Sequence, residues 1–260
     1  MKNKIRLDFL FELTRRNIIE RYIGSAFILL WVLMVPIIPL LTNLLIFYFI
    51  ANIPQIQGMG IINYSVFIFS GLLPYRIFQK AAAESGEQLI SKMPILKNVF
   101  FPLPYIGLSF LGTLLFEFIL QFSIMLILLF ISDHAFTLRL LLLPIILTIF
   151  SLLLIGSIWL ISVVGYLFKD IKEVINVSFL ALVYITPTMY PIEAAPKFLQ
   201  PLFHYNPLTH MTLVFRDVLI PSDGSYQFSS WIYFTLFSLF IFVLGYACIN
   251  KIKRYVGDMV

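Results

Sequence analysis

Long apolar stretches without the alternation of a β-strand constrain this chain more than any other feature. A helix needs about 20 apolar residues to cross roughly 30 Å of hydrocarbon, and a chain in lipid must satisfy its own backbone hydrogen bonds. Hydrophobic residues make up 60% of the 260 residues, and charged residues only 12%. We therefore expect an all-α integral membrane protein with a single transmembrane domain, residues 1–260. The six expected spans are 27–51, 61–82, 105–131, 140–168, 174–192 and 231–250.

Basic residues predict the orientation of these spans, because Lys and Arg are enriched in loops that stay in the cytoplasm. Of the 18 basic residues, all but three lie in the N-terminal tail, around the connections after the second and fourth spans, or at the C-terminus. The three on the opposite side are Arg139, Lys197 and Arg216. This asymmetry predicts that both termini are cytoplasmic. Topology and contact with anionic membrane lipids also account for the net charge of +5, so no nucleic-acid partner is expected.

Residues 1–26 precede the first span and are expected to form a cytoplasmic interface helix. Apolar residues recur at helical spacing over 5–22, at Leu7, Leu10, Phe11 and Ile18. Charged residues occupy other positions around this helix, which is typical of a helix lying in the membrane interface. The helix is either a passive anchor or a slide helix that shapes a lateral entrance or contacts a cytoplasmic partner.

The inner connection 84–98 mixes polar and apolar residues at helical spacing and is longer than a simple connector requires. We expect its helix to stop at Pro94, since proline breaks helices. A short helix parallel to the membrane suits docking into a cleft on a soluble subunit. The alternative is a solvated linker.

The outer stretch 193–230 is the longest segment expected outside the membrane. Its two apolar runs, 198–203 and 208–220, are divided by Asn206-Pro207 and are too short to cross. Non-helical backbone at membrane depth is tolerated only where it is buried in protein or lines a cavity. We expect two short re-entrant helices that plug or line an exit, and the alternative is a helical loop on the surface.

Glu117 lies near the middle of the third span, with Gln121 one turn further on. A charged carboxylate there costs roughly 2.5–3.5 kcal/mol on insertion scales, so Glu117 should be protonated, paired or in contact with water. A proton-coupled carrier would use such a group, but no intramembrane His or Lys is expected nearby. A structural hydrogen bond between helices is therefore the favoured interpretation.

Aromatic and neighbouring residues form stripes on two of the predicted spans. They include Phe27, Trp31 and Tyr48 in the first span and Phe179, Thr186 and Tyr190 in the fifth. Aromatic rings offer an apolar face and, in Tyr and Trp, a polar group. Such stripes suit a conduit for sugar rings, although packing between helices is the simpler explanation.

Motifs of nucleotide and metal chemistry are not found in the sequence. No G-x-x-x-x-G-K-[ST] phosphate loop occurs, so no ATP site is expected on this chain. The three His residues and the single Cys248 are scattered and lack metal-ligand spacing. Neither a G-x-S-x-G elbow nor an H-E-x-x-H pair is present. We therefore expect that the chain is not an enzyme and holds no cofactor itself.

Five segments carry a more specific pattern. They are TRRNIIERYIGSAFILLWVLMVPII (14–38), SGLLPYRIFQKAAAESGEQLISKMPILKNVFFPLP (70–104), GYLFKDIKEVI (165–175), TPTMYPI (186–192) and NPLTHMTLVFRDVLI (206–220). In this order on the predicted topology, they resemble the transmembrane subunit of ABC-2 type exporters. The resemblance is closest to permeases for O-antigen, capsular polysaccharide or teichoic acid.

The resemblance implies partners and a location. Two copies of the chain would form a pore and bind two nucleotide-binding ATPase subunits, which hold ATP and Mg. The complex would lie in the bacterial inner membrane and move a polyprenyl-diphosphate-linked glycan, similar to O-antigen, from cytoplasm to periplasm.

The resemblance also implies roles for individual residues. ATPase coupling would involve Glu84, Glu87, Leu89, Ile90, Lys92 and Lys97. Contact with the diphosphate at the entrance would involve Arg15, Arg16 and Arg21, since guanidinium groups match phosphate geometry, although topology alone would also place them there. The two aromatic stripes would line the channel, and the outer gate would include Phe203, Asn206 and Pro207. Lys169 and Asp170 match a family signature.

Three alternatives stay open. The same fold could carry a drug, haem or a peptide, and a proton-coupled secondary carrier would depend on Glu117. A membrane enzyme acting on polyprenyl phosphates would need several carboxylates near one membrane face. The inner connections offer Glu84, Glu87, Asp170 and Glu173, and each lies near a Lys in sequence, which favours solvated ion pairs.

Overall fold

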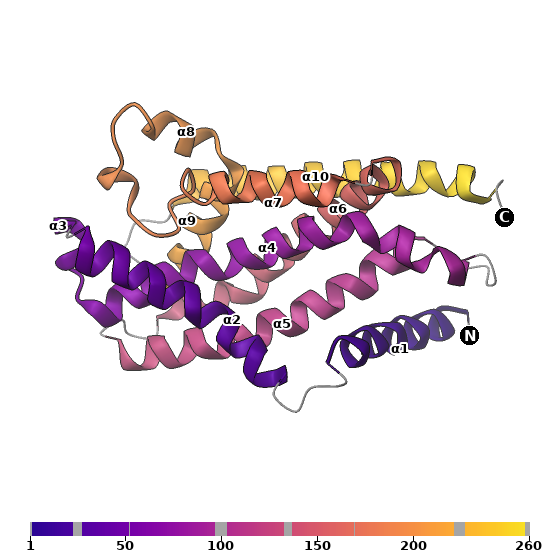
Figure 1. Ribbon diagram of the computed structural model, residues 1–260, viewed down its shortest axis with the longest axis horizontal. Helices are drawn as coiled ribbons and strands as arrows, with labels where there is room; N and C mark the ends of the chain where they lie inside the picture. The colour runs from indigo at the N-terminus through magenta and orange to yellow at the C-terminus, as the bar shows by residue number, and fades with distance from the viewer. Residues whose placement is uncertain are drawn as a thin grey trace.

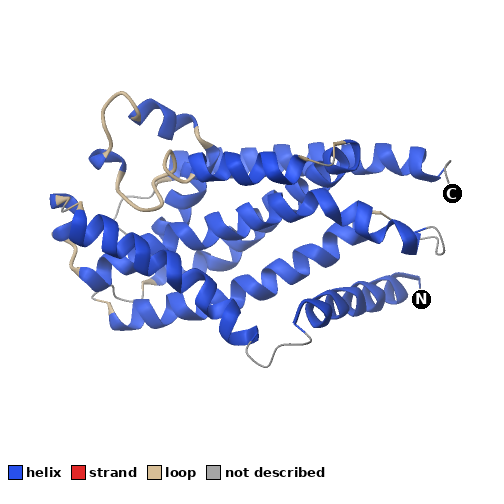
Figure 2. Ribbon diagram, viewed as in Figure 1, coloured by secondary structure: helices blue, strands red, loops and turns tan. Residues whose placement is uncertain are grey.

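The computed structural model describes residues 2–22, 28–51, 53–96, 103–132, 137–168, 170–220 and 227–257. All regular structure within these ranges is helical (Figure 2). The helices form an elongated bundle in which α1 begins and α10 ends at the same end, which we name the termini end (Figure 1). The short helices α3, α8 and α9 lie at the opposite end, named the distal end.

The described residues form ten α-helices that differ widely in length. They are α1 Lys2–Tyr22, α2 Ile28–Asn43, α3 Pro54–Gln57, α4 Ile61–Leu96, α5 Pro104–Ile131, α6 Leu143–Leu167, α7 Ile171–Leu182, α8 Gln200–Tyr205, α9 Pro207–Leu219 and α10 Phe228–Gly257. A π-helical segment, Leu44–Ile50, continues α2, and 3₁₀ turns occur at Leu138–Leu142 and Ile192–Ala194. The helix expected over 5–22 is confirmed as α1.

Five segments of the described chain are long and apolar enough to cross a membrane. They are Val32–Ile50, Ile61–Leu89, Pro104–Ile131, Leu138–Leu167 and Phe228–Ile252. These correspond to the first, second, third, fourth and sixth spans expected from the sequence.

The expected fifth span, 174–192, does not form one long helix. The helix α7 covers 12 residues, Ile171–Leu182, and turns follow it up to Tyr190. Pro187 explains the break, because its ring clashes with the carbonyl group four residues earlier, at Val183, and its nitrogen cannot donate a hydrogen bond. Thr186, Pro187 and Thr188 are buried, so this irregular backbone is covered by protein.

The centre of the bundle is α4, which packs against α5, α6, α7 and α9. Glycine pairs allow two of the helix contacts to be very close, as small residues do in membrane helices. A Cβ atom on Gly245 of α10 would lie 2.1 Å from the carbonyl oxygen of Gly156 on α6. A Cβ atom on Gly165 of α6 would lie 2.4 Å from Cα of Gly86 on α4.

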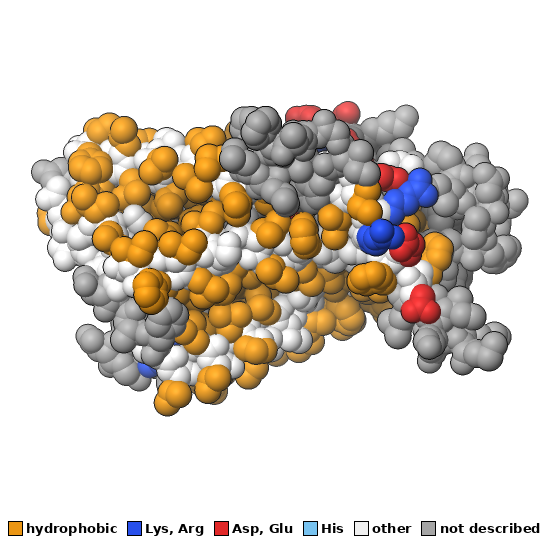
Figure 3. Space-filling model, turned by 90° about the horizontal axis from the view of Figure 1, so that it is seen from below, with side chains coloured by type: hydrophobic (Ala, Val, Ile, Leu, Met, Phe, Trp, Pro, Cys, Tyr) orange, Lys and Arg blue, Asp and Glu red, His pale blue; other side chains and the backbone are white. Residues whose placement is uncertain are grey.

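The surface separates apolar and charged regions. Large apolar side chains remain exposed along α2, α7 and α10, including Val35, Val177 and Val243. On the face shown in Figure 3, hydrophobic side chains cover most of the bundle, and most acidic and basic side chains gather toward the termini end. This distribution suits a bundle whose middle lies in lipid or against another apolar chain.

Candidate functional site

A network of four charged side chains joins α1, α4 and α5. Glu117, only 2% exposed on α5, accepts hydrogen bonds from Lys80 Nζ at 2.6 Å and from Arg21 Nη1 at 2.9 Å. Arg21 also pairs with Glu84, and Lys80 Nζ lies 4.0 Å from a Glu84 oxygen. Two cations therefore face two carboxylates, which we name the α1–α4–α5 network.

This network accounts for the carboxylate within the third span. A buried carboxylate is tolerated when it is paired and hydrogen-bonded, and here each Glu117 oxygen receives a cationic donor. The expectation that no Lys lies nearby was wrong, because packing of α4 on α5 brings Lys80 to Glu117. Burial acts to lower the pKa of Arg21, but Glu84 and Glu117 outweigh it and raise that pKa.

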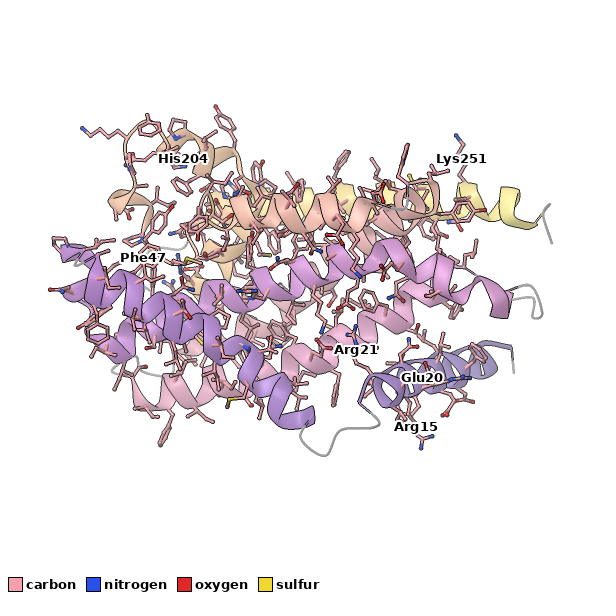
Figure 4. All side chains as sticks on the ribbon, in the orientation of Figure 1. Arg15, Glu20, Arg21, Phe47, His204 and Lys251 are labelled. Carbon is pink, nitrogen blue, oxygen red and sulfur yellow. The ribbon has the colours of Figure 1, made fainter. Side chains whose placement is uncertain are left out.

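The three arginines predicted to contact a diphosphate differ in their surroundings. Arg21 is occupied by the network, between α1 and α5, whereas Arg15 points away from the bundle (Figure 4). Arg15 pairs with Glu12 at 3.2 Å and Arg16 with Glu20 at 2.6 Å, and all four side chains are exposed. Arg15 and Arg16 therefore remain accessible from outside the chain.

The predicted coupling segment is the last part of α4 and not a separate helix. α4 runs without a break from Ile61 to Leu96, past Pro94, where a stop was expected. Glu84 belongs to the α1–α4–α5 network, and Leu89 is buried within the chain. Glu87 is exposed and accepts a hydrogen bond from Lys172 Nζ of α7 at 2.9 Å.

Some of the predicted site residues lie outside the described part of the structure. The side chains of Trp31, Ile90 and Lys92, and all of Phe27, Lys97 and Lys169, lie outside the described residues. Asp170 is described, and it precedes the first turn of α7 as an exposed residue.

Contacts fasten the end of α4 to α6 and α7. Ser162 Oγ donates to the Ser85 carbonyl oxygen at 2.9 Å. A Cβ atom on Gly86 would lie 2.7 Å from Cγ2 of Ile171, so α7 begins against α4. Glu87 lowers the energy of the charged amine of Lys172 through its hydrogen bond and charge, and so raises the pKa of Lys172. Movement of this part of α4 would therefore carry the start of α7 with it.

The described residues of the aromatic stripes pack within the chain. Phe179 is buried with its ring centroid 5.6 Å from that of Tyr75, whose hydroxyl donates to the Phe179 carbonyl oxygen at 2.8 Å. Tyr48 stacks on Tyr64 at 5.9 Å, and Tyr190 meets Phe203 edge to face at 6.2 Å. A different side of α7 is open, with exposed side chains at Val174, Val177 and Leu180, and Tyr184 in the turns after α7 is exposed as well.

Asn206 connects the two predicted outer motifs. Its side-chain oxygen accepts from Leu208 N at 2.9 Å and caps α9, whose first residue is Pro207. Its side-chain nitrogen donates to the Ile185 carbonyl oxygen and to Thr186 Oγ1, both at 2.9 Å. The turns that follow α7 are thus tied to the start of α9.

Two adjacent residues of opposite charge on α9, Arg216 and Asp217, are candidate functional residues that were not predicted from the sequence. Asp217 accepts hydrogen bonds from Arg139 Nη1 at 2.6 Å and from Trp231 Nε1 at 2.8 Å. Arg216, 8% exposed, lies 3.6 Å over the Phe67 ring, and its Nη2 donates to the carbonyl oxygens of Thr188 and Phe67. The available signal was an Arg-Asp pair inside an apolar run too short to cross.

A cavity of about 710 Å³ opens beside Arg216 at the distal end. The start of α4, the segment 191–193, helices α8 and α9 and the start of α10 surround it. Burial lowers the pKa of Arg216 to about 9, although the charges of Tyr64 and Glu193 act in the opposite direction. The cavity combines a buried cation with polar and apolar walls, which is typical of a ligand site.

The fold and these clusters define a multi-pass helical membrane protein. The chain belongs to the ABC-2 type transporter family, whose model matches residues 9–220. It is 27% identical over 258 residues to the O-antigen export system permease protein RfbA of Klebsiella pneumoniae, covering 97% of this chain and 96% of that protein. The same comparison with the polysialic acid transport protein KpsM of Escherichia coli gives 27% identity over 225 residues, or 82% of each chain. The resemblance to ABC-2 exporters is confirmed.

Proposed function

We propose that this chain is the channel-forming permease subunit of an ATP-driven exporter, which moves a lipid-linked polysaccharide similar to O-antigen from cytoplasm to periplasm. The observation that carries this proposal is the match to an O-antigen export permease over nearly the full length of both chains. The family membership supports an ATPase partner, because the chain has no phosphate loop of its own.

A second copy of the chain completes the channel in this proposal. The exposed apolar sides of α2, α7 and α10 give each copy surfaces that suit either lipid or the partner copy. Most residues of the predicted aromatic stripes pack within one chain, so the conduit is proposed to form where the open sides of two copies face each other.

The complex crosses the inner membrane six times per chain, with both termini in the cytoplasm. The fifth crossing consists of α7 and the buried turns after it, since irregular backbone is tolerated at membrane depth when protein covers it. α8, with 6 residues, and α9, with 13, are too short to cross and are proposed as re-entrant gate helices.

In this proposal, conformational change in the ATPase reaches the outer gate through helices that contact one another. The nucleotide-binding subunit is proposed to dock at the end of α4, where Glu87 is exposed and Leu89 supports the segment from within. The contacts of Ser85, Gly86 and Glu87 carry motion of α4 to α6 and α7. The turns after α7 then transmit it to Asn206 and the outer gate.

The entrance lies beside α1. Arg15 and Arg16 are exposed, and within the described residues each pairs with a neighbouring glutamate of the same helix, so an arriving diphosphate can compete for them. Glu117 is engaged by two cations, which favours a structural role over the proton relay of a secondary carrier.

Reconstitution tests this proposal. The tagged chain is co-expressed with a candidate nucleotide-binding ATPase subunit from the same organism, purified and inserted into vesicles with a radiolabelled lipid-linked glycan. Glycan should become accessible on the opposite side only with ATP, and a Lys-to-Ala change in the phosphate loop of the ATPase should abolish this. Uphill transport by the isolated chain on a proton gradient, lost in Glu117→Gln, would instead identify a secondary carrier.

A further inference from the structure

Two residues that line the cavity beside Arg216 carry hydrogen-bonding groups that the protein itself does not satisfy. Among the described residues, Arg216 Nε and Thr209 Oγ1 are buried without any hydrogen-bond partner. Both residues line the cavity, with Arg216 8% exposed and Thr209 1% exposed. Buried polar groups of this kind are rare in folded proteins, since each costs about 1–3 kcal/mol when left unpaired.

Among the described residues, no carboxylate forms an ion pair with Arg216 either. Its hydrogen bonds run from Nη2 to two carbonyl oxygens, which orient the guanidinium but do not neutralise it. The neighbouring Asp217 is already engaged by Arg139 and Trp231. Glu193 lies at the cavity rim as an exposed residue and forms no ion pair with Arg216. A buried cation in this state favours the arrival of an anionic group.

The two unsatisfied groups have a spacing that suits an extended ligand. Thr209 and Arg216 lie two turns apart on the same side of α9, which separates their backbones by about 10 Å. Between them the wall presents Leu213, and other walls present Met59 and His204, the latter on α8 at the distal end (Figure 4). Alternating polar and apolar contacts match linked sugar rings, which have polar rims and apolar faces.

We propose that this cavity binds an acidic saccharide unit, with an oxyanion of the sugar at Arg216 and a hydroxyl group of the next unit at Thr209. This rests on the proposed function for the identity of the ligand as a saccharide. It adds a binding site on the exit side of the permease and a preference for sugars that carry a carboxylate or phosphate group.

Direct binding tests the site without ATP or transport. The full chain is placed in phosphatidylcholine nanodiscs, which avoids sugar-based detergents, and titrated with digalacturonate by ligand-observed saturation-transfer NMR. Digalacturonate should bind. The affinity of its uncharged methyl ester should be lower by about tenfold or more, because the ester cannot form a charge-assisted hydrogen bond with Arg216. Equal binding of the acid and the ester would overturn the contact with Arg216.

Two pairs of variants separate a binding role from a structural one. Glu193→Gln removes a like charge from the rim and should tighten digalacturonate binding several-fold, whereas Asp8→Asn on α1 should not. Ser229→Trp fills the cavity mouth and should abolish binding, whereas Phe228→Trp, at an exposed neighbouring residue that does not line the cavity, should retain it. Unchanged affinity in both cavity variants would overturn the proposal.

A phospholipid headgroup offers the same phosphate chemistry from another source. Glycerol 3-phosphate should fail to displace digalacturonate at equal concentration, because it cannot reach from Arg216 to Thr209. If glycerol 3-phosphate displaces digalacturonate, and displaces it more strongly in Glu193→Gln than in the wild type, the cavity is a lipid site and the saccharide assignment is overturned. Failure of binding with intact ATP-driven export would leave the proposed function standing, so the two conclusions fail separately.

Discussion

The two ends of the bundle treat buried charge differently. At the α1–α4–α5 network, two cations and two carboxylates meet, and the most buried member, Glu117, has a cationic donor on each oxygen. At the distal end, Asp217 is matched by Arg139, but the partners of Arg216 within the described part of the chain are carbonyl oxygens and an aromatic ring. The first arrangement pairs its charges within one chain, whereas we propose that the second is completed by a bound anion.

This difference distinguishes charges that hold the helices together from a charge that is available to bind a ligand. A balanced network lowers the energy of one geometry and holds α1 against α4 and α5. A buried cation without a counter-charge destabilises the protein when no ligand is bound. Binding of an anion then stabilises the folded protein. Variants in the balanced network and in the connections to the outer gate therefore test this difference.

Removing Glu117 should have the largest effect on stability. Glu117→Leu leaves Arg21 and Lys80 facing each other without their shared carboxylate, so we expect a loss of about 3 kcal/mol. The expectation stays at the low end of the range for buried pairs because both cations are about one-third exposed and can be rehydrated. Unfolding in SDS mixed micelles measures the loss.

The double variant Lys80→Met/Glu117→Leu provides the control for that prediction. It removes one cation together with the carboxylate, so it should recover part of the lost free energy of unfolding. If the double variant is as unstable as the sum of the single variants, the charges do not stabilise one another and the network is not balanced.

Asp217→Asn should have the next largest effect, about 2 kcal/mol of unfolding free energy. The amide keeps an acceptor for Trp231 but removes the charge opposite Arg139, whose side chain is only 11% exposed. The variant therefore removes the carboxylate charge opposite a second, largely buried arginine at the distal end. Stability equal to that of the wild type would show that Arg139 does not need the carboxylate.

Asn206 allows the capping of α9 to be separated from its tie to the turns after α7. Asn206→Ala loses both and should cost about 1–2 kcal/mol. Asn206→Asp keeps the acceptor for Leu208 N but loses the donor to Ile185 and Thr186, so its loss of stability should be smaller. Thermal unfolding in nanodiscs measures both, and equal losses would mean that the cap contributes nothing.

The sequence predicted the elements that depend on composition. Apolar length located five of the expected spans, and helical periodicity located α1 before the first of them. Asn206-Pro207 marked the start of α9, because both residues favour a helix N-terminus by local chemistry. Each of these signals is contained within a short window of residues.

Features that depend on packing between distant segments could not be predicted. Arg21 and Lys80 are separated from Glu117 by 96 and 37 residues, so no local pattern indicates that they meet. Basic residues near span ends also have a topological explanation that hides a pairing role. Arg216 was counted as a topology signal for the same reason. The cavity beside it is the observation that indicates a binding role instead.

The exposed pair of Glu87 and Lys172 should produce the smallest effect on stability and a clear one on transport. The Lys172 side chain is 37% exposed and that of Glu87 58% exposed, so solvent weakens their pairing and Lys172→Met should change the midpoint of unfolding little. The pair nevertheless joins α4 to the start of α7, so the variant should reduce the amount of glycan exported per ATP hydrolysed. The exchanged pair Glu87→Lys/Lys172→Glu should restore part of that ratio, since attraction between the helices returns. Equal export ratios in all three proteins would place the transmission from α4 to α7 in the buried contacts of Ser85 and Gly86 instead.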